Sequence, residues 1–217
     1  MFDLMLIAGV LCVMLSAFAI IEHLHSSLVL VKAGEDGTRI APGTSLSEAQ
    51  AKWREESEEA AIQAYLRQRR LGNTQKAGEL GARMVDEIIV TEHPDPPSDI
   101  SCDQFITQLK VLCAFAVNRV LEEHAPGAIV GQSTLSAFYD AVQDRDPDFY
   151  EAISESGSFS FYMYLFRSEA AEPMAFATAF AEACGNKGSE HCVEAGLAAY
   201  TTAYNQAVFL IKQADFK

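Results

Sequence analysis

The residues best suited to chemistry lie in one short stretch, "CGNKGSEHC", which runs from Cys184 to Cys192. Cys184, His191 and Cys192 are ligands of the kind that bind zinc, so they predict a candidate metal site. Their spacing matches no standard zinc motif, and a fourth ligand is not identified. Two other interpretations stay open: a disulfide across a helical hairpin, or, most commonly for so weak a motif, two half-buried cysteines beside a glycine-rich turn.

A second group of chemically capable residues is the alternating acidic run "QDRDPDFY", with Asp144, Asp146 and Asp148. It resembles a calcium loop only superficially, because Pro147 and Phe149 interrupt the pattern of ligands and glycine that such a loop needs. An acidic first turn of a helix explains these carboxylates better. The sequence also lacks a G-x-S-x-G motif, a P-loop and a G-x-G-x-x-G motif. It therefore predicts no catalytic residue and no cofactor, and favours a protein that is not an enzyme.

The N-terminal region holds an uncharged run of 18 residues, from Leu4 to Ile21. A helix of about 20 apolar residues spans a bilayer, and a helix that is apolar on every side lies in lipid or in the centre of a large core. Residues 1–32 are therefore predicted to form a single-pass membrane anchor. The residues expected to contact lipid are Leu4, Ile7, Val10, Leu11, Leu15, Phe18 and Ile21.

Two alternatives to the anchor stay open. A helix buried in a soluble core is the second interpretation, since the rest of the chain is itself predicted to be helical. A cleaved signal peptide is the third: Ala17-Phe18-Ala19 fits a cleavage site, but no Lys or Arg precedes the apolar run. The first basic residues, Lys32 and Arg39, follow the run, which favours a cytoplasmic location for the body of the chain.

The charge of the chain limits its partners. The 217 residues include 30 acidic and 16 basic side chains, which gives a formal net charge of −14. A chain this acidic is repelled by phosphate backbones, so nucleic-acid binding is not expected. Hydrophobic residues make up 49% of the sequence, as in globular proteins.

The elements that follow the anchor are predicted to be helical. Residues 33–44 are rich in glycine and are predicted to be a linker. Residues 45–91 have helical spacing and are predicted to form a helical pair, interrupted at Gly72-Asn73. Three prolines between Glu92 and Asp99 then separate this pair from a main helical bundle over residues 100–217.

The main bundle is predicted to contain six helices. A broad apolar surface marks the first, which ends near His124, as a central core helix. The fourth, "SFSFYMYLF", is assigned as helix mainly because its neighbours are helical. The predicted ranges are 102–124, 133–144, 147–154, 158–166, 172–184 and 190–214. The predicted fold class is thus all-α, an irregular helical bundle preceded by the N-terminal hydrophobic helix.

Three hypotheses about function follow. The first is a membrane-anchored, non-enzymatic interaction protein that contacts the bilayer through residues 4–21 and binds a protein partner. The second is a soluble domain that binds an apolar small ligand between clustered aromatic side chains. Those side chains are Phe138, Tyr139, Phe149, Tyr150, Phe159, Phe161, Tyr162, Tyr164 and Phe166. The third is a metal-dependent protein that uses Cys184, His191 and Cys192.

Overall fold

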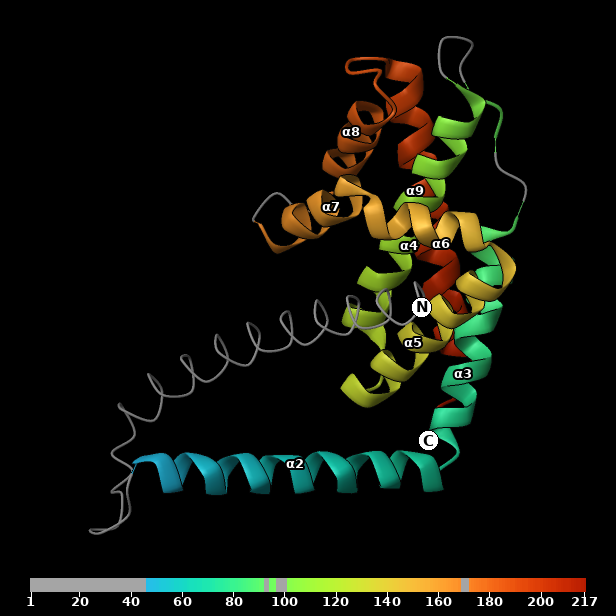
Figure 1. Cartoon of the computed structure of the whole chain (residues 1–217). Helices are drawn as coiled ribbons and strands as arrows, with labels where there is room; N and C mark the ends of the chain where they lie inside the picture. Colours follow the sequence, from blue (N-terminus) through green and yellow to red (C-terminus); the bar gives the residue numbers. More distant parts are fainter. Residues whose placement is uncertain (1–45, 92–93, 97–100, 169–171) are drawn as a thin grey trace, which may run out of the picture. The chain divides into compact units, whose positions relative to one another are not determined.

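The computed structural model describes residues 46–91, 94–96, 101–168 and 172–217, with side chains described from residue 57 onward. Within these ranges the chain is all-helical, with eight α-helices and one short π-helix (Figure 1). The predicted all-α class is therefore confirmed for this part of the chain. The predicted anchor and linker lie outside the described residues. None of the helices in the described ranges is long and apolar enough to cross a bilayer.

The first described helix, α2, runs from Leu46 to Arg70. Arg67, Arg69 and Arg70 occupy its last turn, where positive charge complements the partial negative charge of a helix C-terminus. From Glu58 to Arg70 every side chain is exposed or only partly covered. The helix ends before Gly72, whose φ of 76° lies in the left-handed region that favours glycine.

The next helix, α3, spans Asn73–Met84 and continues as a π-helical turn, η1, from Val85 to Ile89. It packs closely against α5, which spans Ala128–Arg145. Gly81 makes this approach possible, because a Cβ there would lie 2.5 Å from the Thr134 carbonyl oxygen. Leu80, Met84 and Ile89 belong to the same buried cluster as the main bundle.

The first residue of α5 differs from the predicted one. The helix was expected to begin at residue 133, after Gly131, but it begins at Ala128, directly after the break at Gly127. Gly131 lies inside the helix, where an added Cβ would meet the Ala125 Cβ at 3.2 Å. Glycine suits position 131 of α5 because the chain at Ala125, just after the preceding helix, packs closely against it.

The central helix is α4, Cys102–His124. Eleven of its residues are buried, including Phe105, Leu112 and Phe115, as its broad apolar surface predicts. Ser101 occupies the N-cap position, and its side chain makes no capping hydrogen bond.

The remaining helices follow the predicted ranges closely. They are α6 (Pro147–Glu155), α7 (Gly157–Arg167), α8 (Pro173–Ala183) and α9 (Glu190–Gln213). Asp146 caps α6 by accepting a hydrogen bond from the Phe149 backbone N–H at 3.2 Å. Ser189 caps α9 in the same way, through the Cys192 N–H at 3.3 Å. The helical assignment of the aromatic segment in α7 is confirmed.

The core has its centre at Phe115 of α4. Its ring packs against Phe176 of α8 and Tyr162 of α7, at centroid distances of 4.9 and 5.4 Å. Tyr200 of α9 stacks beside it at 6.3 Å. Side chains from α4, α7, α8 and α9 therefore meet at one buried aromatic cluster, and this cluster fixes how those helices are arranged.

Candidate functional site

The three predicted metal ligands have different surroundings. Cys184 and Cys192 are 4% and 0% exposed, and their side chains hydrogen-bond with each other. The His191 side chain is 89% exposed, and its Nδ1 lies 3.8 Å from a Glu194 carboxylate oxygen. The structure thus brings the two cysteines together at the turn between α8 and α9 and leaves His191 at the surface.

The buried cysteines are weak candidates for chemistry. The four described cysteines are present as thiols. Burial raises the pKa of Cys113 and of Cys184 to about 12, which keeps both protonated, whereas nucleophiles and metal ligands need the thiolate. Among the described residues, no group of three or more His, Cys, Asp or Glu side chains is arranged to hold a metal ion. A zinc site here stays a prediction.

Tyr162 adds an unusual polar atom beside these thiols. The residue is fully buried, and its hydroxyl has no hydrogen-bond partner among the described atoms. Burial raises its pKa, and the nearby Cys184, Cys192 and Cys113 raise it further. Because a buried hydroxyl without a partner costs about 1–3 kcal/mol, Tyr162 is held in place by the packing of its ring.

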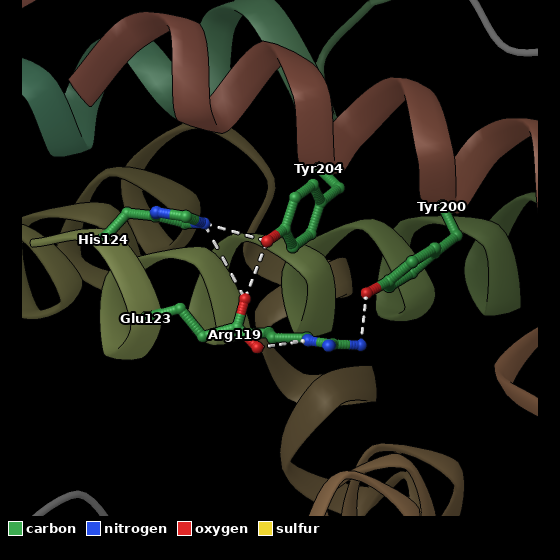
Figure 2. A network of polar contacts seen from close by, with 5 residues as sticks. All are labelled: Arg119, Glu123, His124, Tyr200 and Tyr204. Carbon is green, nitrogen blue, oxygen red and sulfur yellow. Dashed lines mark hydrogen bonds and ion pairs between the residues drawn. The ribbon is translucent and has the colours of Figure 1, made fainter. Parts of the chain in front are cut away.

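A polar network joins α4 to α9 at the edge of the aromatic core (Figure 2). Arg119 donates to a Glu123 carboxylate oxygen at 2.8 Å and to the Tyr200 hydroxyl at 2.9 Å. The Tyr204 hydroxyl donates to the other oxygen of Glu123 at 2.7 Å. The His124 Nε2 lies 2.9 Å from that hydroxyl. Since the hydroxyl proton already goes to Glu123, His124 is the donor in this contact.

Helical periodicity explains why these residues meet. Arg119 and Glu123 are four residues apart on α4, and Tyr200 and Tyr204 are four apart on α9, so each pair lies on one side of its helix. The Arg119 guanidinium also lies over the Phe166 ring, 5.0 Å from its centroid. This arrangement keeps the charge of Arg119 against aromatic faces, where a cation is stabilised.

The electrostatics of the network oppose acid–base catalysis. Burial raises the pKa of Glu123, but hydrogen bonds from Tyr204 and Arg119 and the charge of Arg119 lower it by more, so the net shift is downward. Burial and the hydrogen bond to Glu123 raise the pKa of Tyr204 to about 12. A general acid or base works best with a pKa near the working pH, and both shifts lead away from it. The network therefore acts as a clamp between α4 and α9.

A different feature, a surface groove, lies between α7 and α8. It is an open cavity of about 430 Å³. Its walls include Gln108 of α4 and two glutamates, at the ends of α6 and α8. The lining residues are Gln108, Glu155, Ser156, Gly157, Ser158, Phe161, Ala179, Glu182 and Ala183. The Ser158 hydroxyl donates to the Gln108 side-chain oxygen at 2.6 Å, which ties the start of α7 to α4.

Two exposed aromatic residues lie on α7, and one of them, Phe161, lines this groove. Phe161 is 45% exposed and Tyr164 is 67% exposed, and both belong to α7. Their rings stack on each other, 6.3 Å apart with 16° between their planes. Large aromatic side chains that stay exposed beside a groove are typical of binding surfaces. This aromatic pair and the groove make up the candidate functional site.

The remaining aromatic residues of the predicted ligand pocket fill or border the core. Phe138, Phe149 and Tyr162 are buried. Tyr139, Tyr150, Phe159 and Phe166 pack against the core from its edges. A second open cavity, of about 460 Å³, lies between the end of α4 and the start of α5 and has no aromatic lining. Only Phe161 of the nine predicted residues borders either cavity, and an apolar ligand site stays a prediction.

No protein-family model, no curated protein and no solved structure matches this chain. Arg119 and Glu123 were not predicted as site residues, although their spacing of four residues is a usable signal for an ion pair. Phe161 and Tyr164 were predicted only as members of an aromatic cluster, because composition alone does not separate exposed from buried aromatic residues.

Proposed function

We propose that this chain is a membrane-anchored, non-enzymatic interaction protein. Its anchor is the uncharged run from Leu4 to Ile21. Its acidic helical body lies in the cytoplasm, because the first basic residues, Lys32 and Arg39, follow the run and positive charge favours the cytoplasmic side. The body binds a cationic segment of a partner protein in the groove between α7 and α8. The proposal is supported by the length and apolarity of the run and by the exposed aromatic pair beside an acidic groove.

The observation that carries the binding role is the exposed stack of Phe161 on Tyr164. The same helix buries Tyr162 completely, so α7 presents one side to the core and keeps two large rings in solvent. Exposed aromatic surface is costly in water, and aromatic residues supply much of the binding energy at interfaces. Their rings also attract cations.

The charge of the groove suggests the chemistry of the partner. Glu155 and Glu182 line it, and the whole chain has a net charge of −14. Lys187 pairs with Glu182 at 2.6 Å through a side chain that is 82% exposed. A partner lysine or arginine can replace so exposed a cation at little cost, since surface ion pairs contribute about 0–1 kcal/mol. Attraction between the acidic groove and a cationic partner then favours that partner over others and raises the rate of association.

The membrane part of the proposal is tested by fractionation. The full chain is expected to stay in the membrane fraction after extraction with alkaline carbonate and to dissolve only in detergent. A variant with Leu11→Arg and Leu15→Arg places two charges in the run and is expected to lose this behaviour. Complete release of the unchanged chain by carbonate would refute the anchor.

The binding part is tested with a defined probe, a peptide that carries two arginines, titrated into isotopically labelled full chain in detergent. Backbone shifts are expected at Ser156, Gly157 and Phe161. The double variant Phe161→Ala/Tyr164→Ala is expected to weaken binding at least tenfold. Phe209→Ala is the matched control, because Phe209 is 50% exposed on α9 and does not line the groove. Equal binding by all three chains would contradict the proposed site.

A further inference from the structure

The helix α2 carries an exposed stripe whose residues are Glu58, Ile62, Tyr65 and Arg69. Their spacing of four, three and four residues places them on one side of the helix. Ile62 is 57% exposed and Tyr65 is 46% exposed. The side chains of these four residues form no hydrogen bond or ion pair with any other side chain that the structure describes, although the Arg69 carbonyl oxygen accepts from the Gly72 N–H at the helix end. Within the described part of the chain, the stripe therefore makes no polar side-chain contact.

The order of residues along this stripe is self-complementary. When a second copy of the helix lies antiparallel, with a two-fold axis between positions 63 and 64, Glu58 faces Arg69 and Ile62 faces Tyr65. The same pairs then recur on the other side of the axis, as in an isologous interface. Parallel pairing in register would instead set Glu58 against Glu58 and Arg69 against Arg69, with repulsion at both ends.

We propose that α2 is a self-association surface, which pairs antiparallel with α2 of a second copy of this chain. Two apolar contacts form the centre, and two ion pairs close the ends. Ala61 and Leu66 flank the stripe on opposite sides; the two-fold axis places each of them on the same flank as its own copy, so both extend the apolar centre. The charges select the direction of pairing, and the apolar residues supply the attraction.

This surface is independent of the groove between α7 and α8, since it involves none of the same residues. Because the ion pairs are exposed to solvent, salt screens them, and the dimer is expected to weaken as ionic strength rises. Binding at the groove is expected to continue in variants that no longer associate through α2. The two proposals can therefore fail separately.

The first test is a charge exchange in the full chain, followed by sedimentation velocity in a non-ionic detergent at low salt. The unchanged chain is expected to be dimeric. Glu58→Arg alone and Arg69→Glu alone each place like charges together and are expected to weaken the dimer at least tenfold. The double variant Glu58→Arg/Arg69→Glu restores both ion pairs and is expected to recover the dimer.

Gln63→Arg is the matched control, because it adds a charge on the opposite side of α2 and is expected to leave the dimer intact. A monomeric full chain at all concentrations would overturn the proposal. So would a dimer that tolerates both single charge reversals, because its interface would then lie elsewhere. Binding of Ile62 and Tyr65 by another part of the same chain, seen as their protection from hydrogen exchange in a monomer, would overturn it as well.

The second test determines the direction of pairing. A mixture of Glu58→Cys and Arg69→Cys chains is expected to form disulfide-linked heterodimers on mild oxidation by a small-molecule disulfide. The Glu58→Cys chain alone is not expected to cross-link at this position, because two copies of residue 58 would lie about 16 Å apart along an antiparallel pair. Peptide mapping identifies the linked residues. Cross-links between two copies of residue 58 would indicate a parallel pair and contradict the proposal.

Discussion

The helices α4 and α2 are nearly equal in length, with 23 and 25 residues, and have opposite surroundings. In α4 eleven side chains are buried, and Phe115 is the centre of the aromatic core. In α2 the described side chains from Glu58 to Arg70 remain exposed or partly covered. The contrast indicates that α4 is stabilised by the rest of the bundle, whereas the described half of α2 buries little surface and depends mainly on interactions within the helix.

The largest predicted loss of stability comes from truncating a core side chain of α4, and it tests the contrast between α4 and α2 most directly. Phe115→Ala removes a ring that contacts the rings of α7, α8 and α9, and should lower the free energy of unfolding by about 3–5 kcal/mol. Tyr65→Ala on α2 is the control and should change it by less than about 0.5 kcal/mol. Urea unfolding, followed by circular dichroism at a concentration where the chain is monomeric, measures both. Equal losses would show that α2 is as strongly packed as α4.

A second prediction concerns α3, which has one face packed against α5 and another face exposed to solvent. Gly81→Ala should cost about 1–3 kcal/mol, because the new Cβ would lie 2.5 Å from the Thr134 carbonyl oxygen and 2.7 Å from the Phe138 nitrogen. Gly78→Ala meets nothing within 4 Å and should add about 0.5–1 kcal/mol, since alanine favours a helix over glycine. Opposite signs in urea unfolding are the expected result. Two losses of similar size would argue against the close approach of α3 to α5.

A third prediction compares two arginines. Arg119→Ala should cost about 1–3 kcal/mol, because it leaves Glu123 and Tyr200 without their donor and removes packing from the Phe166 ring. Arg69→Ala on α2 should change the stability of the chain by less than about 0.5 kcal/mol when the chain is monomeric. Thermal unfolding of both variants, with Arg119→Lys as a partial rescue, provides the measurement. A neutral Arg119→Ala would mean that the α4–α9 clamp contributes little.

The smallest predicted effect is a pH dependence of the free energy of unfolding, which comes from Glu123 on α4. The folded state lowers the pKa of Glu123, so the carboxylate adds stability above its unfolded pKa, and this stability is lost as the pH falls through the lower folded pKa. Glu123→Gln should therefore unfold more easily than the unchanged chain at pH 7. The two should become similar only when the pH has fallen below the lowered folded pKa, where Glu123 is protonated in the folded chain as well. Unfolding curves across this range measure the difference, and a constant gap would contradict the shift.

Several of these features could be predicted from sequence because they depend on neighbours along the chain. Apolar residues three and four apart predicted α4 and α9, and the acidic run around Asp146 indicated a helix start, which is the start of α6 that Asp146 caps. The aromatic segment of α7 was also assigned correctly. The start of α5 was missed, because Gly131 was taken as a boundary although contact with Ala125 makes glycine suitable inside the helix.

The sequence by itself determined the helical class of the described chain, its acidity and the uncharged run from Leu4 to Ile21, since composition and periodicity act locally. Only the tertiary structure decided which aromatic residues reach solvent and which polar residues meet across helices. Phe161 and Tyr162 are adjacent and chemically similar, yet one lies exposed by a groove and the other is fully buried. Their fates differ because α7 packs on α4 and α8 in one particular rotation, which depends on residues far away in the chain.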